Sequence, residues 1–372
     1  MLREYVTPEI SENDLAPVVE SICGGELSGK WSIELVGDSI GTATLGIHRV
    51  RGSAVKPTGE SVHWSAILKI IDADKDASGQ REYQMASSSY LHSLNSGIRP
   101  AICYAATERT GSERWLGTED LSGAVQPPWS DSTFLDVARD VGKFNGQTSL
   151  SAPTEQWEAT GIAAIIETLG PAKILDNFET TTSDDLASIM FGQSGPDAVR
   201  NVLDKYSQVV DGLAGIANIV AHGDIHVGNL FPIVSNGVHE ETVTIDWASC
   251  GMGAPVEDVG NLIAVPFRKH AIDMGRFEEL GEQVFGRYLE GLLSINPEAN
   301  VEDARTGFVA GFGYWALIKL MLLTTFIASN PESPELLKKR YGIDPDDLVR
   351  RWGGLVDRSL PYAVECVERL GV

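Results

Sequence analysis

The chain has 372 residues and a formal net charge of −23, and 43% of its residues are hydrophobic. This hydrophobic content can fill a sizeable core, so the composition excludes a largely disordered protein. The negative charge excludes sequence-independent binding to nucleic acid or to an anionic membrane, because both need a basic surface. A cationic partner would be attracted to such a protein. The acidity is equally well explained by solubility, and both interpretations stay open.

Several features predict a cytoplasmic protein. The first residues turn polar and acidic at once, unlike a signal peptide. The most apolar segment, Phe308 to Ala328, carries Lys319 and stands alone, so we expect a buried helix rather than a membrane span. The cysteines lie far apart and show no zinc-site spacing. They are predicted to be core residues in a reducing compartment: Cys23, Cys103, Cys250 and Cys366.

The N-terminal third begins with a short helix and continues as strands. Apolar residues at helical spacing, after the N-cap candidate Ser11, predict a helix over residues 8–24. Turn residues then separate segments of β type, with one helical stretch among them. The expected order is strands at 31–38, 41–52 and 63–71, a helix at 79–94, and strands at 102–108 and 114–121.

The rest of the chain is mainly helical by its apolar spacing. Helices are expected at 132–147, 155–170, 197–216, 275–294 and 306–329. One β island interrupts them, where residues 229–234 and 241–247 are joined through Ser235-Asn236-Gly237, a strong hairpin signal. The fold class is therefore predicted as α+β, with a β-rich N-terminal lobe at 1–118 and a helical C-terminal lobe at 119–372.

The β island brings together polar residues that suit phosphoryl transfer. Asp224, His226 and Asn229 precede its first strand, and Asp246 ends its second. Phosphoryl transfer needs a carboxylate that accepts the proton of the acceptor hydroxyl, and oxygen ligands that hold Mg²⁺ against a triphosphate. Asp224 fits the first role, and Asn229 and Asp246 fit the second.

These segments resemble a known family. HGDIHVGN followed by IDW is similar to the catalytic loop and metal-binding segment of the aminoglycoside phosphotransferase and choline kinase-like family, relatives of protein kinases. The resemblance implies a two-lobed protein-kinase-like fold, Mg²⁺, and ATP or GTP as phosphoryl donor. It also implies supporting roles for residues around the loop, namely His222, His226 and Asp258. Asp258 is alternatively an ordinary acid at a helix start.

The resemblance extends to the N-terminal lobe. In a kinase-like lobe a strand lysine contacts the α- and β-phosphates and pairs with a helix glutamate, and Lys69 and Glu82 occupy these places. Lys69 has apolar neighbours on both sides, so a buried ammonium there requires a partner. Lys69 could instead point to solvent, and Glu60 is an alternative acid to Glu82.

Two further segments are expected to contact the nucleotide. Gly37, Ser39 and Gly41 lie between two strands and could cover the phosphates, although such glycines also occur in ordinary hairpins. The stretch RWLGTEDLSG resembles the hinge between kinase lobes, where backbone groups near Glu119 and Leu121 would meet the nucleobase.

The expected function is Mg²⁺-dependent transfer of a γ-phosphoryl group to a hydroxyl of a small molecule. Aminoglycosides, amino alcohols and sugars are candidate acceptors, and the chain does not identify one. Trp247-Ala248 follows Asp246 where protein kinases have Phe-Gly, which favours small acceptors over proteins. The alternatives are a nucleotide-binding pseudokinase scaffold and a metal-dependent hydrolase that uses Asp224, His226 and Asp246.

Overall fold

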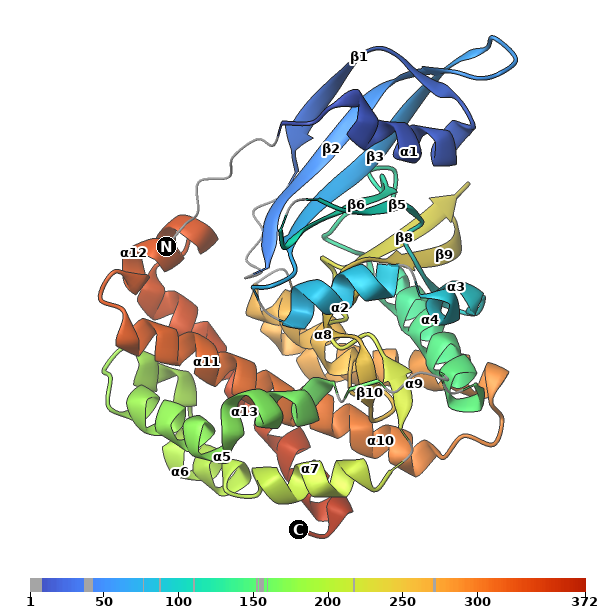
Figure 1. The fold of residues 1–372 in the computed structure, drawn as a ribbon. Coiled ribbons are helices and arrows are strands. Elements are labelled where there is room, and N and C mark those ends of the chain that lie inside the picture. The colour runs from blue at the N-terminus through green and yellow to red at the C-terminus, as the bar shows by residue number, and fades with distance from the viewer. Residues whose placement is uncertain are drawn as a thin grey trace. The chain divides into compact units, whose positions relative to one another are not determined.

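The computed structural model describes residues 9–36, 43–75, 77–86, 88–109, 111–151, 153, 157–158, 160–216, 218–269 and 272–372. The chain divides into two compact units, which are treated separately here (Figure 1). Unit 1 consists of Met1–Asn95, Arg99–Val125 and Val243–Ser249; unit 2 consists of Ser96–Ile98, Gln126–Thr242 and Cys250–Val372. The division expected at 118/119 stays a prediction about domains. The compact units differ from it by assigning 119–125 and Val243–Ser249 to unit 1 and Ser96–Ile98 to unit 2.

Unit 1 contains an antiparallel sheet of order β1-β2-β3-β6-β5. Its strands are β1 (Glu26–Leu35), β2 (Thr44–Val55), β3 (Ser61–Asp72), β5 (Cys103–Glu108) and β6 (Glu113–Glu119). Its helices are α1 (Glu12–Cys23), α2 (Ala77–Ala86), α3 (Ser89–Ser93) and η2 (Trp247–Ser249). The predicted order of strands, helix and strands is confirmed. The single helix expected at 79–94 is instead α2 and α3.

The two faces of this sheet carry different side chains. Leu68 and Ile70 of β3 are buried in the core that α1 covers with Val18 (Figure 1). Because successive residues of a strand point to opposite faces, Lys69 faces the other way. That face packs against α2, where Tyr83 lies against the small core around Ile71. The alternation therefore separates the charged residue of β3 from the apolar core.

Unit 2 is mainly helical. Its longer helices are α4 (Asp131–Leu150), α5 (Gly161–Thr182), α6 (Gly195–Leu203), α7 (Tyr206–Ala214), α8 (Val259–Arg268), α9 (Phe277–Ile295), α10 (Val301–Val309), α11 (Ala316–Ser329), α12 (Ser333–Tyr341) and α13 (Pro345–Leu370). Shorter turns are η1 (Ala187–Phe191), η3 (Met274–Arg276) and η4 (Ala310–Trp315), the last a π-helix. The short strands β7 (Ile219–Ala221) and β10 (Gly251–Gly253) pair with each other.

The predicted hairpin is present. Strand β8 (Leu230–Ser235) pairs with β9 (Val238–Thr244), and the chain passes between the units within β9, as it does within β4 (Ile98–Pro100). Asn236 and Gly237 both have positive φ, 53° and 76°. A two-residue turn with left-handed backbone at both positions matches the twist of a hairpin, and Asn-Gly is the pair that adopts it at least cost.

One continuous helical segment runs from Val301 to Ser329 through α10, η4 and α11. Within the described ranges it is the single helix whose length and composition would let it cross a membrane, yet 83% of its most apolar window is buried inside the protein. The aromatic side chains of Phe308 and Phe312 stack on each other within it. The segment lies in the core of unit 2, as a buried helix does.

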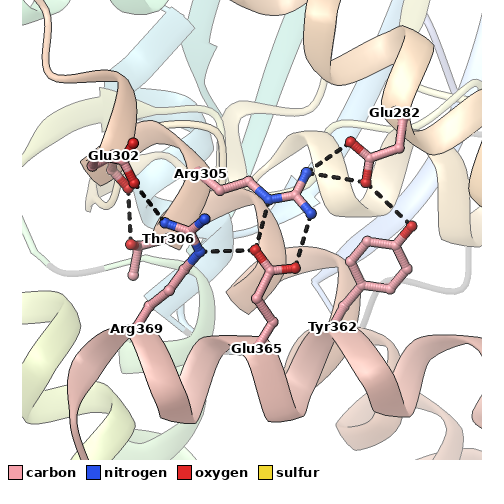
Figure 2. A network of polar contacts seen from close by, with 7 residues as sticks. All are labelled: Glu282, Glu302, Arg305, Thr306, Tyr362, Glu365 and Arg369. Atoms are coloured by element: carbon pink, nitrogen blue, oxygen red, sulfur yellow. Dashed lines mark hydrogen bonds and ion pairs between the residues drawn. The ribbon is translucent and has the colours of Figure 1, made fainter.

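An ionic network joins three helices of unit 2 around Arg305 (Figure 2). The Arg305 guanidinium of α10 contacts Glu282 of α9 at 2.8 Å and Glu365 of α13 at 2.9 Å. Arg369 extends the network, with contacts of 2.8 Å to both Glu365 and Glu302. A guanidinium satisfies two carboxylates at once because its donors form a planar fork. These helices are therefore held by charge as well as by apolar packing.

Candidate active site

In unit 1, a lysine whose side chain is only 13% exposed lies between two carboxylates. The Lys69 Nζ is 2.5 Å from Glu82 Oε1 and 3.1 Å from Asp246 Oδ1. The predicted pair with Glu82 is present, and the partner Asp246 was not foreseen. Glu60, the other candidate acid, pairs with Lys56 at 2.9 Å. An ammonium at this depth keeps its charge because two carboxylates neutralise it.

The protonation of this cluster follows from burial and charge. Burial alone would lower the pKa of Lys69, but the charges of Glu82 and Asp246 outweigh it and raise that pKa. Burial raises the pKa of Glu82 to about 7, although the Lys69 ammonium opposes the shift. Lys69 is therefore charged at neutral pH. Its positive charge is what a polyphosphate would bind.

Asp246 has a strained backbone. Its φ is 65°, in the left-handed region that non-glycine residues rarely adopt. Helix η2 begins at Trp247, the next residue, and packs against α2, which carries Glu82. Backbone strain of this kind persists only where the surroundings enforce it, and it gathers at functional sites. In this conformation the Asp246 carboxylate contacts Lys69.

In unit 2, hydrogen bonds with α4 and with Asp258 hold the loop that carries Asp224 and the strand before it. Strand β7 leads into it, and Asn145 and Thr148 of α4 donate hydrogen bonds to the carbonyl of Val220. Asp258, at the start of α8, accepts the backbone N–H of Gly223 with both carboxylate oxygens. The structure thus places Asp258 beside the loop, as the family resemblance implies, and gives it more than a helix-start role.

The loop side chains converge on Asp224. Asn229 Nδ2 donates to the Asp224 carbonyl at 3.0 Å and to its Oδ2 at 3.3 Å. His226 Nδ1 accepts the N–H of Gly228, so a neutral ring carries its proton on Nε2, which lies 3.6 Å from Asp224 Oδ2. His222 is buried, and its Nδ1 accepts the backbone N–H of Asp224. One Asp224 oxygen is thereby held in place.

These contacts keep Asp224 ionised. Burial alone would raise the pKa of Asp224, but the nearby His226 ring and the positive charge of Lys319 together hold it well below its ordinary value. Burial raises the pKa of Asp258 to about 6, and hydrogen bonds from Gly223 and His222 offset part of that effect. Asp224 is accordingly a hydrogen-bond acceptor throughout the physiological pH range.

The expected hinge residues have partners of their own. The Glu119 side chain pairs with Arg99 at 2.8 Å, and its backbone N–H donates to the carbonyl of Ile102. The carbonyl of Leu121 accepts from Ala124, whereas its N–H has no hydrogen-bond partner in the described part of the chain. Of these two backbone N–H groups, the one of Leu121 is thus left available as a donor among the described residues. Residues Gly37, Ser39 and Gly41 lie outside the described residues.

Two charged residues near the loop were missed by the sequence reasoning. Glu257 is buried and accepts the backbone N–H of Ile162 at the start of α5, and burial raises its pKa to about 8. Lys319 of α11 lies within electrostatic reach of Asp224. A lysine in an otherwise apolar segment was a signal for Lys319. Nothing local distinguishes Glu257 from any acid at a helix start.

Comparison of the sequence with protein-family models and with curated proteins finds no match. Comparison of the structure finds amicoumacin kinase hAmiN, in complex with AMP-PNP, Ca²⁺ and Ami, at 15% identity and a TM-score of 0.52, covering 85% of this chain and 88% of that one. This chain has a kinase-like fold. The α+β class and the resemblance stated from the sequence are confirmed at the level of the fold.

Two phosphotransferases are also similar to this kinase-like fold. Spectinomycin phosphotransferase APH(9)-Ia, in complex with ADP and spectinomycin, is 12% identical, with 93% of this chain and 98% of that chain covered and a TM-score of 0.49. Aminoglycoside phosphotransferase APH(4)-Ia, in a ternary complex with ADP and hygromycin B, is also 12% identical, with 94% and 98% covered and a TM-score of 0.48.

The predicted metal ligands of the kinase-like fold have suitable donor atoms. Asn229 commits its amide nitrogen to Asp224, which leaves the oxygen Oδ1 for a cation. Asp246 uses Oδ1 for Lys69, and its side chain is 39% exposed. No cluster of three or more His, Cys, Asp or Glu suited to a metal occurs among the described residues. Mg²⁺ does not need one, because it is held by one or two carboxylates together with substrate phosphates.

Proposed function

We propose that this protein is a phosphotransferase that moves the γ-phosphoryl group of a nucleoside triphosphate to a hydroxyl of a small molecule. The observation that carries the proposal is the Lys69 ammonium held between Glu82 and Asp246. A scaffold has no need for such a cluster, whereas phosphate binding requires a fixed cation. The kinase-like fold supports the same interpretation.

In this proposal unit 1 binds the phosphates. Lys69 contacts the α- and β-phosphates, and Glu82 orients it. The N–H of Leu121 contributes to nucleobase binding. Asp246 and Asn229 are the residues that would hold Mg²⁺, for which their oxygen donors are suited. When bound, Mg²⁺ neutralises charge that develops on the phosphate oxygens.

Asp224 acts on the acceptor. In the transfer, the acceptor oxygen forms a bond to the γ-phosphorus, the bond to the bridging oxygen breaks, and the nucleoside diphosphate leaves. The hydroxyl proton passes to Asp224 and then to solvent. Because the pKa of Asp224 is low, Asp224 is a weak base. It mainly orients the hydroxyl and takes the proton late, which suits a loose transition state.

The proposal also includes the phosphoryl donor, the metal, the cellular location and the acceptor. ATP and GTP are both candidate donors, and Mg²⁺ is the proposed metal. A cytoplasmic location is supported by the free thiols of Cys23, Cys103, Cys250 and Cys366. The acceptor is an alcohol such as an amino sugar, an amino alcohol or a sugar.

A screen of alcohol acceptors tests the function directly. The purified protein is incubated with γ-labelled ATP or GTP, Mg²⁺ and each alcohol, beside an Asp224→Asn control. Label transferred to an alcohol by the wild type and not by the control supports the proposal. Label released only as inorganic phosphate indicates a hydrolase. Nucleotide binding without any turnover indicates a pseudokinase scaffold and would overturn the proposal.

A further inference from the structure

The hydroxyl of Tyr288 in α9 has no role in the mechanism above. Tyr288 is fully buried, and its hydroxyl donates a hydrogen bond of 2.8 Å to Asn145 Oδ1 of α4. Burial raises the pKa of this hydroxyl well above its ordinary value, so the hydroxyl stays a donor at physiological pH. A phenylalanine would fill the same apolar space without a polar atom that needs a partner. The hydroxyl is therefore explained by its hydrogen bond and not by packing.

Asn145 connects this hydroxyl to the strand that leads into the catalytic loop. Its Nδ2 donates to the carbonyl of Val220 in β7 at 3.5 Å, and Thr148 Oγ1 donates to the same carbonyl at 3.3 Å. Strand β7 pairs with β10 along one edge. Val220 is buried, and a buried backbone carbonyl needs a donor. Side chains of α4 therefore satisfy a carbonyl of β7 that would otherwise need a further strand.

The Tyr288 hydroxyl decides which end of the Asn145 amide faces the strand. An amide side chain accepts through its oxygen and donates through its nitrogen. Because the hydroxyl donates to Oδ1, Nδ2 is left to face the carbonyl of Val220. If the amide rotated by half a turn, Oδ1 would face that carbonyl, and two acceptors would meet. Asn145 is buried, so the repulsion would not be relieved by bulk water.

Close contact between α4 and α9 fixes the place of this hydrogen bond (Figure 1). A Cβ on Gly142 would lie 2.0 Å from the carbonyl oxygen of Tyr288, and a Cβ on Gly291 would lie 2.0 Å from the carbonyl oxygen of Arg139. The two main chains touch at these glycines, which have no Cβ to keep them apart. Neither helix can slide along the other without a collision. The Tyr288 hydroxyl is therefore held at a fixed position relative to α4.

The catalytic loop is held at a second point by α8. Asp258 of α8 accepts the N–H of Gly223, and α8 itself touches the π-helix η4. A Cβ on Gly260 of α8 would lie 2.3 Å from the carbonyl carbon of Gly311 in η4, so these two main chains are in direct contact. The side chains of α4 thus support the β7 end of the loop, and α8 supports the peptide that precedes Asp224.

We propose that Tyr288 is a positioning residue of the catalytic loop, which acts by orienting the Asn145 amide that holds the carbonyl of Val220. This inference rests on the proposed function. Val220 lies four residues before Asp224. An extended residue spans about 3.3 Å, so a shift of β7 reaches Asp224 through a short length of chain. A misplacement of about 1 Å at a reacting group can lower a rate about 100-fold.

Two matched variants test the inference, with the alcohol that the acceptor screen identifies. Tyr288→Phe removes one hydroxyl. The control is Tyr314→Phe, because Tyr314 is also fully buried and its hydroxyl donates at 2.8 Å to the carbonyl of Val202 in α6. Each variant loses one buried hydrogen bond, so each should lower the Tm by a similar amount. Only Tyr288→Phe should lower kcat, by about 10- to 100-fold, while the KM for the nucleotide stays unchanged in both.

A double-mutant cycle separates positioning from stability. Asn145→Leu replaces the amide with an apolar group of similar size and should lower kcat at least as much as Tyr288→Phe does. The double variant removes both polar partners and should recover part of the lost Tm, because neither buried group then lacks its partner. Its kcat should stay at the level of Asn145→Leu, since Tyr288 acts through Asn145. If kcat recovers together with the Tm, lost stability caused the slow turnover and the inference is overturned.

Hydrogen exchange tests the loop without any turnover. The amide hydrogens of residues 219–229 are followed by mass spectrometry in wild type and in both tyrosine variants. They should exchange faster in Tyr288→Phe than in wild type, because β7 opens more often when the Asn145 amide is free to rotate. Tyr314→Phe should exchange these hydrogens as wild type does. Equal exchange of this segment in Tyr288→Phe and Tyr314→Phe overturns the inference.

The same data separate this inference from the proposed function. If wild type phosphorylates an alcohol and Tyr288→Phe does so with an unchanged kcat, the inference is wrong and the phosphotransferase proposal stands. If exchange of residues 219–229 rises in Tyr288→Phe alone but wild type transfers label to no alcohol, the inference about the loop stands and the phosphotransferase proposal is wrong.

Discussion

Asp258 accepts the backbone N–H of Gly223 through both carboxylate oxygens, at 2.9 and 3.1 Å, and so holds the peptide that precedes Asp224. In Asp258→Asn one of these acceptors becomes an N–H₂ group that faces another donor. We expect kcat to fall about 10- to 100-fold, as is typical when the support of a catalytic group is lost. Steady-state kinetics measure the fall. Nucleotide affinity should be unchanged, and Asp204→Asn, an exposed acid in the same unit, serves as the control.

Asp224→Asn should lower kcat by about 10²- to 10⁴-fold while nucleotide affinity barely moves, because the carboxylate contacts the acceptor and not the triphosphate. Steady-state assays measure kcat, and nucleotide titrations measure nucleotide affinity. The low pKa of Asp224 adds a pH test. The carboxylate stays ionised as the pH falls to 5, so the wild-type rate should show no acid limb from this group above that pH. Near-normal turnover of the variant would remove Asp224 from the reaction.

Asp246→Ala should weaken Mg²⁺-dependent nucleotide binding more than Asn229→Ala does, because a carboxylate supplies a full charge and an amide supplies a dipole. Calorimetry with a nonhydrolysable nucleotide measures both. The structure adds a control without metal, because Asp246 also forms an ion pair with Lys69. In excess chelator, Asp246→Ala should bind the nucleotide at least as well as wild type. Equal metal-dependent affinity in wild type and Asp246→Ala contradicts the assignment.

Lys69→Met should slow transfer by weakening phosphate positioning, and the paired carboxylates determine its effect on stability. The variant leaves Glu82 buried without its cation, which costs about 3–5 kcal/mol when the acid stays ionised. Glu82 can escape this cost by protonation, because burial raises its pKa to about 7. We therefore expect Lys69→Met to stay folded below neutral pH. Lys69→Met with Glu82→Gln should recover the free energy of unfolding at higher pH, measured with denaturant, but not the activity.

The raised pKa of Glu257 predicts that the stability of the protein depends on pH. Burial raises its pKa to about 8 in the folded chain from an ordinary value of 4.5. Between these values the folded state binds a proton that the unfolded state has lost, so the free energy of unfolding falls as the pH rises. Glu257→Gln keeps an oxygen for the N–H of Ile162 and should flatten this decline. Denaturant titrations from pH 5 to 8 measure it, with Glu240→Gln, an exposed acid, as the control. If the free energy of unfolding declines with pH equally in Glu257→Gln and Glu240→Gln, Glu257 is not the cause of the decline.

Local patterns predicted most of the elements. Apolar alternation placed β2 and β3, and the Asn-Gly pair placed the β8–β9 hairpin, because these signals lie within a few residues of the structure they specify. Element ends were less accurate. The helix expected at 155–170 begins at Gly161, where φ is positive, and continues through the kink at Gly170 to Thr182. The π-helical turn of η4 was not foreseen, since it has no characteristic sequence pattern.

The site was predictable only where a motif carried it. His222, Asp224 and Asn229 share one loop, so their spacing reveals them. The contact of Asp246 with Lys69 joins residues far apart in the sequence, and so do the hydrogen bonds that Asn145 and Thr148 donate to the carbonyl of Val220. Such relationships are decided by tertiary structure. Local periodicity contains no information about them.

The contact between Gly260 and Gly311 uses backbone atoms alone. The position of α8, and with it the hydrogen bonds from the Gly223 N–H to Asp258, is therefore fixed by main-chain contact. A side chain added at residue 260 or 311 would force α8 and η4 apart and move the loop that carries Asp224, whereas substitutions along α11 leave this contact unchanged. The loop can thereby keep its position while the sequence of α11 changes.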